Sequence, residues 1–532
     1  MPLISINEVG QFGLLPDLPA HELPFNAWES GENVRFLNGF AQKINGYKEM
    51  FDVPAIVPYF TTFVRNAAGE QYWIYAGSVA VWVWEATGGA ASTHNNITRS
   101  TGAYTSAGAL NWHGGILNGV VVLNNGIDPP QMWNPVQANT LLTTLANWPA
   151  NTTAAIMRSY KNFLIALDVT KAGVRDPRLV KWSHAASAGA VPTSWNEADA
   201  TKDAGEYSLA DTEGALIDCL PLRDSNILYK DDSIWLMEHV SGQSIFRFAP
   251  LFRNAGIFAK NCVVEYQIGK HLVFGRDMVF VHDGQTIVPI TLGKVQDWLY
   301  SNIDAEHANT CFVTLNSANN EVWICFPEIS QSLPTKALIW NWDTGAFGAM
   351  ELPRVSSIGR GMLLEQPSAG DAWNSDATTW EIVGNWGAPS STTAPLNRLL
   401  MAVPGSVKLY GVFEDLLDFN GVDFVCSLER RGLGIPFKVG KAPDIASIKL
   451  CTNIWPRITG TLGDVVQIRF GVQQHIGDTV IWGAWKDFKI GTTKKIDVLA
   501  SGRLFALGFR STNKAKWKLQ GYDLDVQFLG VN

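Results

Sequence analysis

The residues with the greatest capacity for chemistry in this chain are histidines and acidic side chains, and the first candidate motif is incomplete. His21-Glu22 matches the start of the HExxH pattern, in which two histidines four residues apart on one helix face bind zinc. Phe25 stands where the second histidine should be, and the prolines at 19 and 24 oppose a helix. This segment therefore predicts no zinc site.

Asp523 and Asp525 alternate on a predicted strand, so both side chains face the same side of it. Such a pair could serve acid–base catalysis or bind a cation, but a solvated strand face or an interface is the simpler interpretation. A group of four histidines follows no ligand spacing, so we expect them in separate turns and strands. They are His184, His239, His271 and His282.

Other catalytic motifs are also missing from the sequence. The Gly-Lys pairs at 269–270 and 440–441 lack the spacing and the following Ser or Thr of a phosphate-binding loop, so both indicate turns. The chain holds no GxSxG elbow and no CxxC pair. It also lacks the aspartate turns of a sialidase-like propeller. We therefore predict neither an enzyme nor a cofactor.

The composition favours β-structure packed with aromatic side chains. Of 532 residues, 46% are hydrophobic and 17% are charged, with 21 Trp, 26 Phe and 48 Gly. Aromatic residues suit sheets and glycines suit tight turns, whereas a disordered chain suits this composition poorly. The low charged fraction also suits a subunit that buries surface in an assembly. At this length we expect two or three domains, unless a large closed fold absorbs most of the chain.

The net charge of −8 argues against a tight grip on nucleic acid. Lys and Arg are scattered, with no basic run longer than the pairs Arg430-Arg431 and Lys494-Lys495. Phosphate neutralisation needs concentrated positive charge. A mildly acidic wall would repel the DNA backbone, so the charge remains compatible with a surface past which DNA slides.

The six cysteines indicate buried thiols. None lies within three residues of another and most sit inside apolar runs, although three disulfides are possible from the count alone. No export signal opens the sequence, and no run approaches about 18 apolar residues. We expect no membrane span and a protein kept in a reducing cytoplasm during synthesis.

The segment from Ser159 to Ile303 is a series of short apolar runs separated by polar turns, the pattern of consecutive antiparallel hairpins. Similar units recur every 40 to 60 residues between about 56 and 430, without a strict signature. A diffuse repeat of this period favours a β-propeller of six or seven irregular blades, and stacked β-sandwiches are the alternative.

Both ends of the chain differ from this middle region. Residues 1–55 predict an extended segment and a hairpin at Asn38-Gly39, a dipeptide suited to the positive φ of a two-residue turn. Residues 56–434 would form the propeller-like body, and 435–532, with close polar–apolar alternation, predict an antiparallel β-sandwich. Helix is scarce, with 295–303 as one short candidate. The predicted fold is all-β.

Three long polar insertions, 88–110, 183–208 and 367–395, separate predicted strands. Loops of this length are uncommon in compact domains and are usually functional or disordered. We interpret them as candidate lumen or docking loops of an assembly. Their candidate residues are Asn95, Asn96, Glu197, Asp199, Asp203, Asp371 and Asp376.

Three segments resemble one protein family. PFNAWESGENVRFLNGFAQKINGY (24–47) resembles the opening of the tail nozzle, or tail-tubular, proteins of short-tailed bacteriophages, where an Asn-x-Trp-x-x-Gly-x-Asn-Val-Arg-Phe segment precedes a Gly turn and Lys-x-x-Gly. Residues 176–265 are similar to the central region of these proteins, and GRLFALGFRSTNKAKWKLQGYDLDV (502–526) to their C-terminal segment. The matching motifs are structural rather than catalytic.

The resemblance implies a ring of identical subunits, six in number, in the virion tail below the portal and the connector or adaptor protein. Such a ring assembles in the host bacterial cytoplasm, conducts and gates genome DNA during ejection, and docks tail fibres or spikes. It meets the host surface indirectly, and double-stranded DNA passes through it transiently without sequence-specific binding. The chain is shorter than some nozzle proteins, so an additional distal domain is not implied.

Trp and Arg are favoured at the centres of protein interfaces, so they are the candidates for subunit contacts. Core packing is the simpler role for any single one of them. The candidate anchors are Trp28, Arg35, Trp195, Arg503 and Trp517.

Two alternatives remain open from the sequence. One is a receptor-binding or fibre-type tail protein that contacts host surface glycans, since Trp-rich β-surfaces stack on sugars. The other is a propeller glycosidase or lyase, for which we identify no suitable paired carboxylate or arginine cluster.

Overall fold

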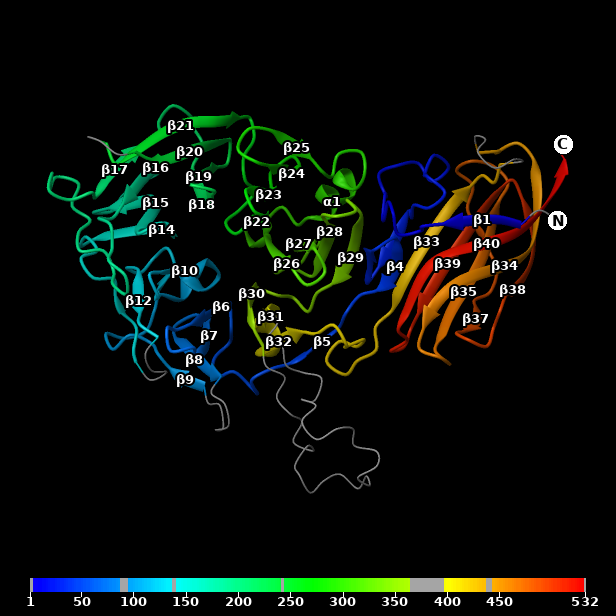
Figure 1. The fold of residues 1–532 in the computed structure, drawn as a ribbon, viewed down its shortest axis with the longest axis horizontal. Coiled ribbons are helices and arrows are strands. Elements are labelled where there is room, and N and C mark those ends of the chain that lie inside the picture. The colour runs from blue at the N-terminus through cyan, green and yellow to red at the C-terminus, as the bar shows by residue number, and fades with distance from the viewer. Residues whose placement is uncertain are drawn as a thin grey trace, which may run out of the picture.

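The computed structural model describes residues 3–86, 94–135, 140–240, 244–363, 397–436 and 443–530, whose strands form a β-propeller joined to a β-sandwich (Figure 1). The propeller lies on the left of the view and the sandwich on the right, where the two chain ends meet. Among the described residues, six four-stranded sheets and the β26–β29 end (312–351) of a ten-stranded sheet form seven blades around the propeller axis. The predicted all-β fold with a propeller-like body is therefore confirmed.

The first four blades follow one another along the chain, each as an antiparallel meander. Blade 1 consists of β6 (Phe60–Arg65), β7 (Gln71–Ala76), β8 (Val81–Ala86) and β9 (His94–Asn96). Blade 2 consists of β10 (His113–Leu117), β11 (Val120–Asn124), β12 (Gln131–Trp133) and β13 (Thr143–Thr144). Blade 3 consists of β14 (Thr152–Tyr160), β15 (Phe163–Lys171), β16 (Val174–Trp182) and β17 (Gly205–Ser208). Blade 4 consists of β18 (Leu216–Leu222), β19 (Ser225–Lys230), β20 (Ser233–His239) and β21 (Phe246–Arg253).

The last three blades complete the circle. Blade 5 consists of β22 (Val263–Gln267), β23 (Lys270–Phe274), β24 (Val279–His282) and β25 (Ile287–Pro289). Blade 6 consists of β26 (Phe312–Asn316), β27 (Glu321–Phe326), β28 (Lys336–Asn341) and β29 (Phe347–Glu351). Blade 7 consists of β30 (Ser357–Met362), β31 (Asn397–Val403), β32 (Lys408–Val412) and β5 (Tyr47–Glu49).

A strand from the N-terminal region closes the ring. The first strands of successive blades contact one another in order, and β30 of blade 7 contacts β6 of blade 1. The outer strand of blade 7 is β5, which pairs with β32 through Glu49 opposite Tyr410 and Tyr47 opposite Val412. Blade 7 is therefore built from segments more than 300 residues apart in the sequence.

The middle strands β11 and β27 are fully buried and largely apolar because both of their sheet faces pack against neighbouring blades. The sequences VVVLN of β11 and EVWICF of β27 are buried at every position. A sheet with one solvated face would alternate polar and apolar residues instead. This explains why the repeat is visible in the sequence as short continuous apolar runs.

The sandwich combines strands from both ends of the chain. One sheet continues from β38 (Ile496–Gly502) through β34 (Ile448–Gly460) to β40 (Trp517–Gly530), and β1 (Leu3–Asn7) and β4 (Phe40–Lys43) both pair with β40. The facing sheet contains β2 (Ser30–Glu32), β33 (Cys426–Leu433), β39 (Leu504–Ser511), β35 (Val465–Gln473), β36 (Ile481–Trp482) and β37 (Lys486–Lys489). One large apolar core fills the space between the two sheets.

The predicted Asn38-Gly39 hairpin is confirmed and joins the two parts of the molecule. It connects β3 (Val34–Leu37) to β4, with φ of 52° at Asn38 and 77° at Gly39. On its other side β3 pairs with β29 through Val34 and Ala349, so a ten-stranded sheet runs from blade 6 into the sandwich.

Helix is confined to one short α-helix and three 3-10 turns among the described residues. The predicted helix is confirmed as α1 (Gln296–Asn302), and the turns are η1 (Ser106–Asn111), η2 (Ala308–Thr310) and η3 (Pro404–Ser406). No helix in the described ranges is long and apolar enough to cross a membrane. All six cysteines are free and buried, as predicted.

Candidate functional site

The inner strands of the propeller carry charged side chains to the middle of the ring. Arg158 belongs to β14, Asp218 to β18, and Asn261 precedes β22. Arg158 Nε donates to Asp218 Oδ1 at 2.8 Å, and Arg158 Nη2 donates to Asp218 Oδ2 at 2.9 Å and to Asn261 Oδ1 at 2.6 Å. The bidentate pair therefore ties blades 3, 4 and 5 together at the channel.

Both members of this pair stay charged. Burial would raise the pKa of Asp218, but Arg158 outweighs burial and lowers it. Burial likewise opposes the charge of Arg158, whose pKa is nevertheless raised by Asp218. Removing one partner of such a buried pair usually costs about 3–5 kcal/mol, because the other charge is left unpaired. Arg158 and Asp218 are thus a structural cross-link between blades.

His113 of β10 lies behind this pair as a neutral, fully hydrogen-bonded side chain. Its Nδ1 donates to the carbonyl oxygen of Asn111 at 2.9 Å, and its Nε2 accepts from the backbone N–H of Met157 at 2.9 Å. Burial, followed by the positive charge of Arg158, lowers the pKa of His113 to about 3. With both nitrogens occupied, His113 holds blades 2 and 3 together and has no free atom for proton transfer.

A cavity of about 220 Å³ adjoins these residues in the channel. That volume holds roughly seven water molecules at ~30 Å³ each. The lining combines Arg158, Asp218, Lys260 and Ser357 with apolar residues such as Trp112 and Phe312. Within the described ranges, no three His, Cys, Asp or Glu side chains lie close enough to hold a metal ion. The cavity suits water or a small solute, and it is far too small for a polymer.

These channel residues were not singled out from the sequence. Arg158 interrupts the apolar run AAIMRSY, and Asp218 interrupts LIDCL. A charged residue inside an otherwise buried strand requires a partner, because an isolated buried charge is prohibitively costly. That rule could have marked both residues, although it could not have identified them as partners.

The structure corrects four of the five predicted interface anchors. Trp28, Arg35, Trp195 and Trp517 are each 1% exposed, so they cannot contact a second subunit in this fold. Trp28 Nε1 donates to the Val9 carbonyl at 2.7 Å in the sandwich core. The prediction was wrong because large aromatic residues fill cores as readily as interfaces. Arg503 is half-buried at the start of β39, and its role at an interface stays a prediction.

Asn95 and Asn96, predicted as loop residues, lie in β9, the outer strand of blade 1, where they pair with Val83 and Trp82. Their assignment to a loop is therefore wrong. Short, polar outer strands resemble loops in sequence, because one of their edges is open to solvent. Their part in docking remains a prediction.

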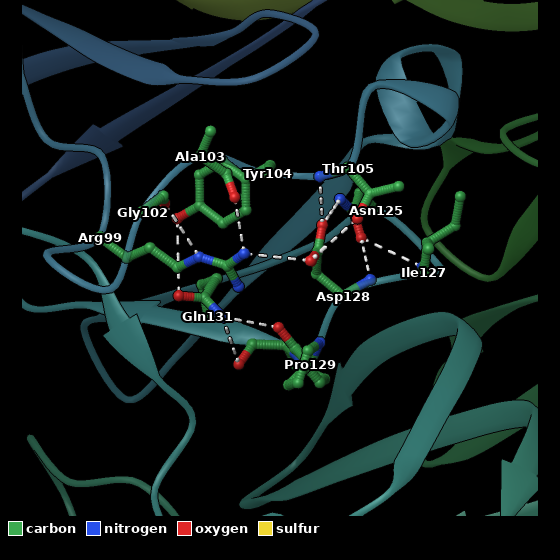
Figure 2. A network of polar contacts seen from close by, with 11 residues as sticks. Arg99, Gly102, Ala103, Tyr104, Thr105, Asn125, Ile127, Asp128, Pro129 and Gln131 are labelled. Atoms are coloured by element: carbon green, nitrogen blue, oxygen red, sulfur yellow. Dashed lines mark hydrogen bonds and ion pairs between the residues drawn. The ribbon is translucent and has the colours of Figure 1, made fainter.

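A polar network fastens the segment that follows β9, as Figure 2 shows. Arg99 Nη2 donates to Asp128 Oδ1 at 3.1 Å and to the Ala103 carbonyl at 2.9 Å. Asp128 Oδ2 also accepts from the Thr105 backbone N–H at 2.8 Å and from Asn125 Nδ2 at 2.7 Å. The residues from 97 to 105 are thus tied to the turn between β11 and β12.

The insertion at 183–208 connects β16 to β17, the outer strands of blade 3, and ends in β17 itself. Glu197 accepts from Lys181 at 2.6 Å and from Lys171 at 3.1 Å. Burial would raise the pKa of Glu197, but these ammonium groups outweigh it and lower the pKa to about 2. The insertion is therefore fixed at the propeller periphery by ion pairs.

The other acidic candidates of this insertion form local contacts. Asp199 Oδ1 accepts from the backbone and the hydroxyl of Thr201, and the Asp203 N–H donates to His184 Nδ1 at 3.0 Å. Asp371 and Asp376, with the insertion 367–395, lie outside the described residues. The proposed docking role of the whole set stays a prediction.

Two of the four histidines lie on separate strands, as expected, but these strands bring them together in the core. His271 and His282 lie opposite each other on β23 and β24, and both contact the hydroxyl of Tyr229. The two histidines are direct cross-strand partners because each lies three residues from the Phe274–Val279 pair that flanks the turn. His184 and His239 take no part in this cluster.

No family model matches this sequence, and no curated protein is similar to it. Similar solved structures include the WD40 β-propeller domain of Doa1, with 9% identity over 69% of this chain and 97% of that chain and a TM-score of 0.37. Another is a fungal alcohol oxidase of the AA5 family in complex with copper, with 8% identity over 92% of this chain and 99% of that chain and a TM-score of 0.40. A third is apo AztD from Citrobacter koseri, with 13% identity over 55% of this chain and 86% of that chain and a TM-score of 0.31. Similarity at this level carries no argument about what the protein does.

Proposed function

We propose that this protein is a structural subunit of a short bacteriophage tail. In this proposal, identical copies form a ring-shaped nozzle, six to a ring, below the connector. The ring conducts and gates the genome during ejection and docks tail fibres or spikes. The proposal rests first on the sequence resemblance of three segments.

The observation that carries the proposal furthest is where these segments lie. Residues 24–47 contain β3 and β4, and 502–526 contain most of β40. The two segments are neighbours in one sheet, with Ala41 opposite Leu519 and Gln42 opposite Lys518. Because two of the segments that carry the resemblance pair in one sheet, they support a scaffold built from segments far apart in the sequence.

The size of the channel cavity indicates where DNA would pass. A space of about 220 Å³ inside the propeller cannot admit a double helix. In the proposed ring the conduit is therefore formed between protomers. The net charge of −8 supports this role, because an acidic wall repels phosphate and keeps DNA from sticking.

An apolar groove of the sandwich offers a surface for a neighbouring copy. It has a volume of about 360 Å³ and lies between β35, β36 and β38, lined by Phe470, Trp482 and Val498. Ile481 is 68% exposed and Leu499 is 82% exposed at its edge. Large apolar side chains grouped at a surface typically mark interaction sites. This groove replaces the buried tryptophans as the proposed subunit contact.

The proposal is tested by the mass and symmetry of the assembly. Native mass spectrometry should detect six copies of the 58.4 kDa chain, alone or after addition of the connector protein. Electron microscopy should show a ring coaxial with the connector. A trimer that binds saccharides would favour a receptor-binding tail protein instead. A protein that never enters a coaxial ring, in solution or in virions, refutes the proposal.

A further inference from the structure

The propeller channel contains a lysine whose charge is not compensated. Lys260 lies just before β22 and lines the channel cavity. Its Nζ donates to Asn111 Oδ1 at 3.0 Å, the one hydrogen bond of this ammonium group among the described residues. An ammonium group has three donors, so two remain for a guest in the cavity.

Asp218, the acidic side chain that interacts electrostatically with this lysine, already accepts four hydrogen bonds. Asp218 Oδ1 accepts from Arg158 Nε at 2.8 Å and from the Cys219 backbone at 2.9 Å. Asp218 Oδ2 accepts from Arg158 Nη2 at 2.9 Å and from the Asn261 backbone at 2.8 Å. Arg158 therefore balances the charge of this carboxylate, so the carboxylate does not also balance the charge of Lys260.

A further donor faces the same cavity from blade 7. The hydroxyl oxygen of Ser357 accepts the backbone N–H of Thr61 at 3.0 Å, and its own O–H has no acceptor among the described residues. Ser357 and Lys260 both line the cavity, which also includes the amide of Asn309. The lining thus combines one uncompensated cation with neutral donors.

We propose that the channel cavity is a binding site for a small oxyanion such as sulfate, phosphate or a carboxylate. Lys260 supplies the charge, and Ser357 and Asn309 supply neutral hydrogen bonds. A cavity of about 220 Å³ has room for such an ion and a few waters. The ion would bridge blades 5, 6 and 7, and would offset the positive charge that Arg158 and Lys260 bring together.

The protonation state of Lys260 makes anion binding at this site dependent on pH. Burial, followed by the neighbouring Arg158, lowers the pKa of Lys260 to about 7. The charged groups that face it are Arg158 from β14 and Asp218 from β18, and both keep their charge, while His113 from β10 stays neutral. Anion binding should therefore be strong near pH 6 and weak near pH 8.5.

The test uses sulfate, whose charge is constant across this range, on the purified full-length protein at fixed ionic strength. Sulfate should raise the unfolding temperature along a saturating curve at pH 6, and half-saturation should require at least fivefold more sulfate at pH 8.5. Lys260→Met should abolish the saturating part and keep the linear salting-out effect of sulfate. Lys489→Met, at an exposed position of β37, is the matched control and should behave as the wild type.

A second measurement needs no variant. Acetic anhydride modifies neutral amines, so Lys260 should be labelled readily at pH 7.5 without sulfate, and sulfate should slow its labelling at least threefold. Mass spectrometry of peptides gives the rate, with Lys489 as internal reference. Sulfate that protects Lys260 and stabilises the wild type supports the site. An equal saturating effect in Lys260→Met, or no protection of Lys260 by sulfate, overturns it. Neither result depends on whether the protein forms a ring.

Discussion

Arg35 Nε lies 3.6 Å from Glu321 Oε1, and this buried ion pair connects the N-terminal hairpin to blade 6. Arg35 projects from β3 and Glu321 from β27, with exposed side-chain fractions of 2% and 0%. Glu321 Oε2 accepts from Asn316 Nδ2 at 3.1 Å and from Trp323 Nε1 at 3.2 Å. Burial raises the pKa of Glu321, and Arg35 opposes that rise only in part. The joint between the propeller and the sandwich thus contains a buried guanidinium and a buried carboxylate that lie close together without a hydrogen bond between Nε and Oε1.

Removing one of these charges should lower the free energy of unfolding more than removing both. We expect Arg35→Met to destabilise the protein by about 3 kcal/mol, because Glu321 is left buried without its cation. Arg35→Met combined with Glu321→Gln should recover at least half of that loss. Chemical unfolding monitored by tryptophan fluorescence measures the difference. If the double variant is no more stable than Arg35→Met, the loss of stability comes from lost packing and not from the unpaired charge of Glu321.

The Tyr229 cluster predicts a loss of stability in mild acid. Tyr229 Oη lies 2.6 Å from His271 Nδ1 and 2.8 Å from His282 Nε2, while His271 Nε2 donates to the Pro221 carbonyl at 2.9 Å. The Gly284 N–H donates to His282 Nδ1, so His282 donates to Tyr229 and Tyr229 donates to His271. Each imidazole is therefore neutral and held in one tautomer.

Burial lowers the pKa of His271 to about 3 and that of His282 to about 4, both below the ordinary value of 6.5. The unfolded chain therefore binds more protons, and the stability is present above pH 6.5 and is lost as the pH falls toward 4. For His271 the loss between pH 6.5 and 4.5 is about 2–3 kcal/mol. The unfolding midpoint of the wild type should fall over this range, and His271→Gln should reduce the slope. An unchanged slope would contradict the assignment.

The network of Figure 2 should govern local opening of the segment after β9. Asp128→Ala removes the acceptor of Arg99, Thr105 and Asn125, so residues 99–105 should exchange amide hydrogens at least tenfold faster. Global stability should fall by only about 1–2 kcal/mol. Asp277→Ala, at an exposed turn, is the control. Unaltered exchange in 99–105 would show that other contacts hold the segment.

Assembly of the proposed ring should depend on the sandwich groove. Leu499→Lys places a charge on an 82% exposed side chain, so the protomer should remain folded while the ring population falls at least tenfold. Val174→Lys alters a 75% exposed residue on the propeller and should leave assembly intact. Mass photometry with circular dichroism distinguishes assembly from folding. A ring that tolerates Leu499→Lys would place the subunit contact elsewhere.

Sequence patterns predicted where strands and turns lie better than they predicted which strands and side chains contact each other. Asn38-Gly39 predicts its hairpin because the turn conformation is local, and 159–303 predicts its strands because blades are meanders of adjacent segments. The partnership of β5 with β32, or of Arg158 with Asp218, depends on ring closure, which no local pattern encodes. Trp28 and Trp517 were predicted at an interface but lie in the core. Residue type shows that a side chain is hydrophobic, but it does not distinguish a core position from an interface position.

The position of β40 in the sequence also determines when the sandwich can fold during synthesis. β40 pairs with β1, β4 and β34, so β1 cannot pair until a strand more than 500 residues later in the sequence has been synthesised. Contacts that span the full chain length slow folding, because the loop must close before they form. β1 therefore stays unpaired until β40 has been synthesised, and a chain that lacks β40 cannot complete the sandwich. The sheet that contains β1, β4 and β34 is therefore complete only after β40 has been synthesised.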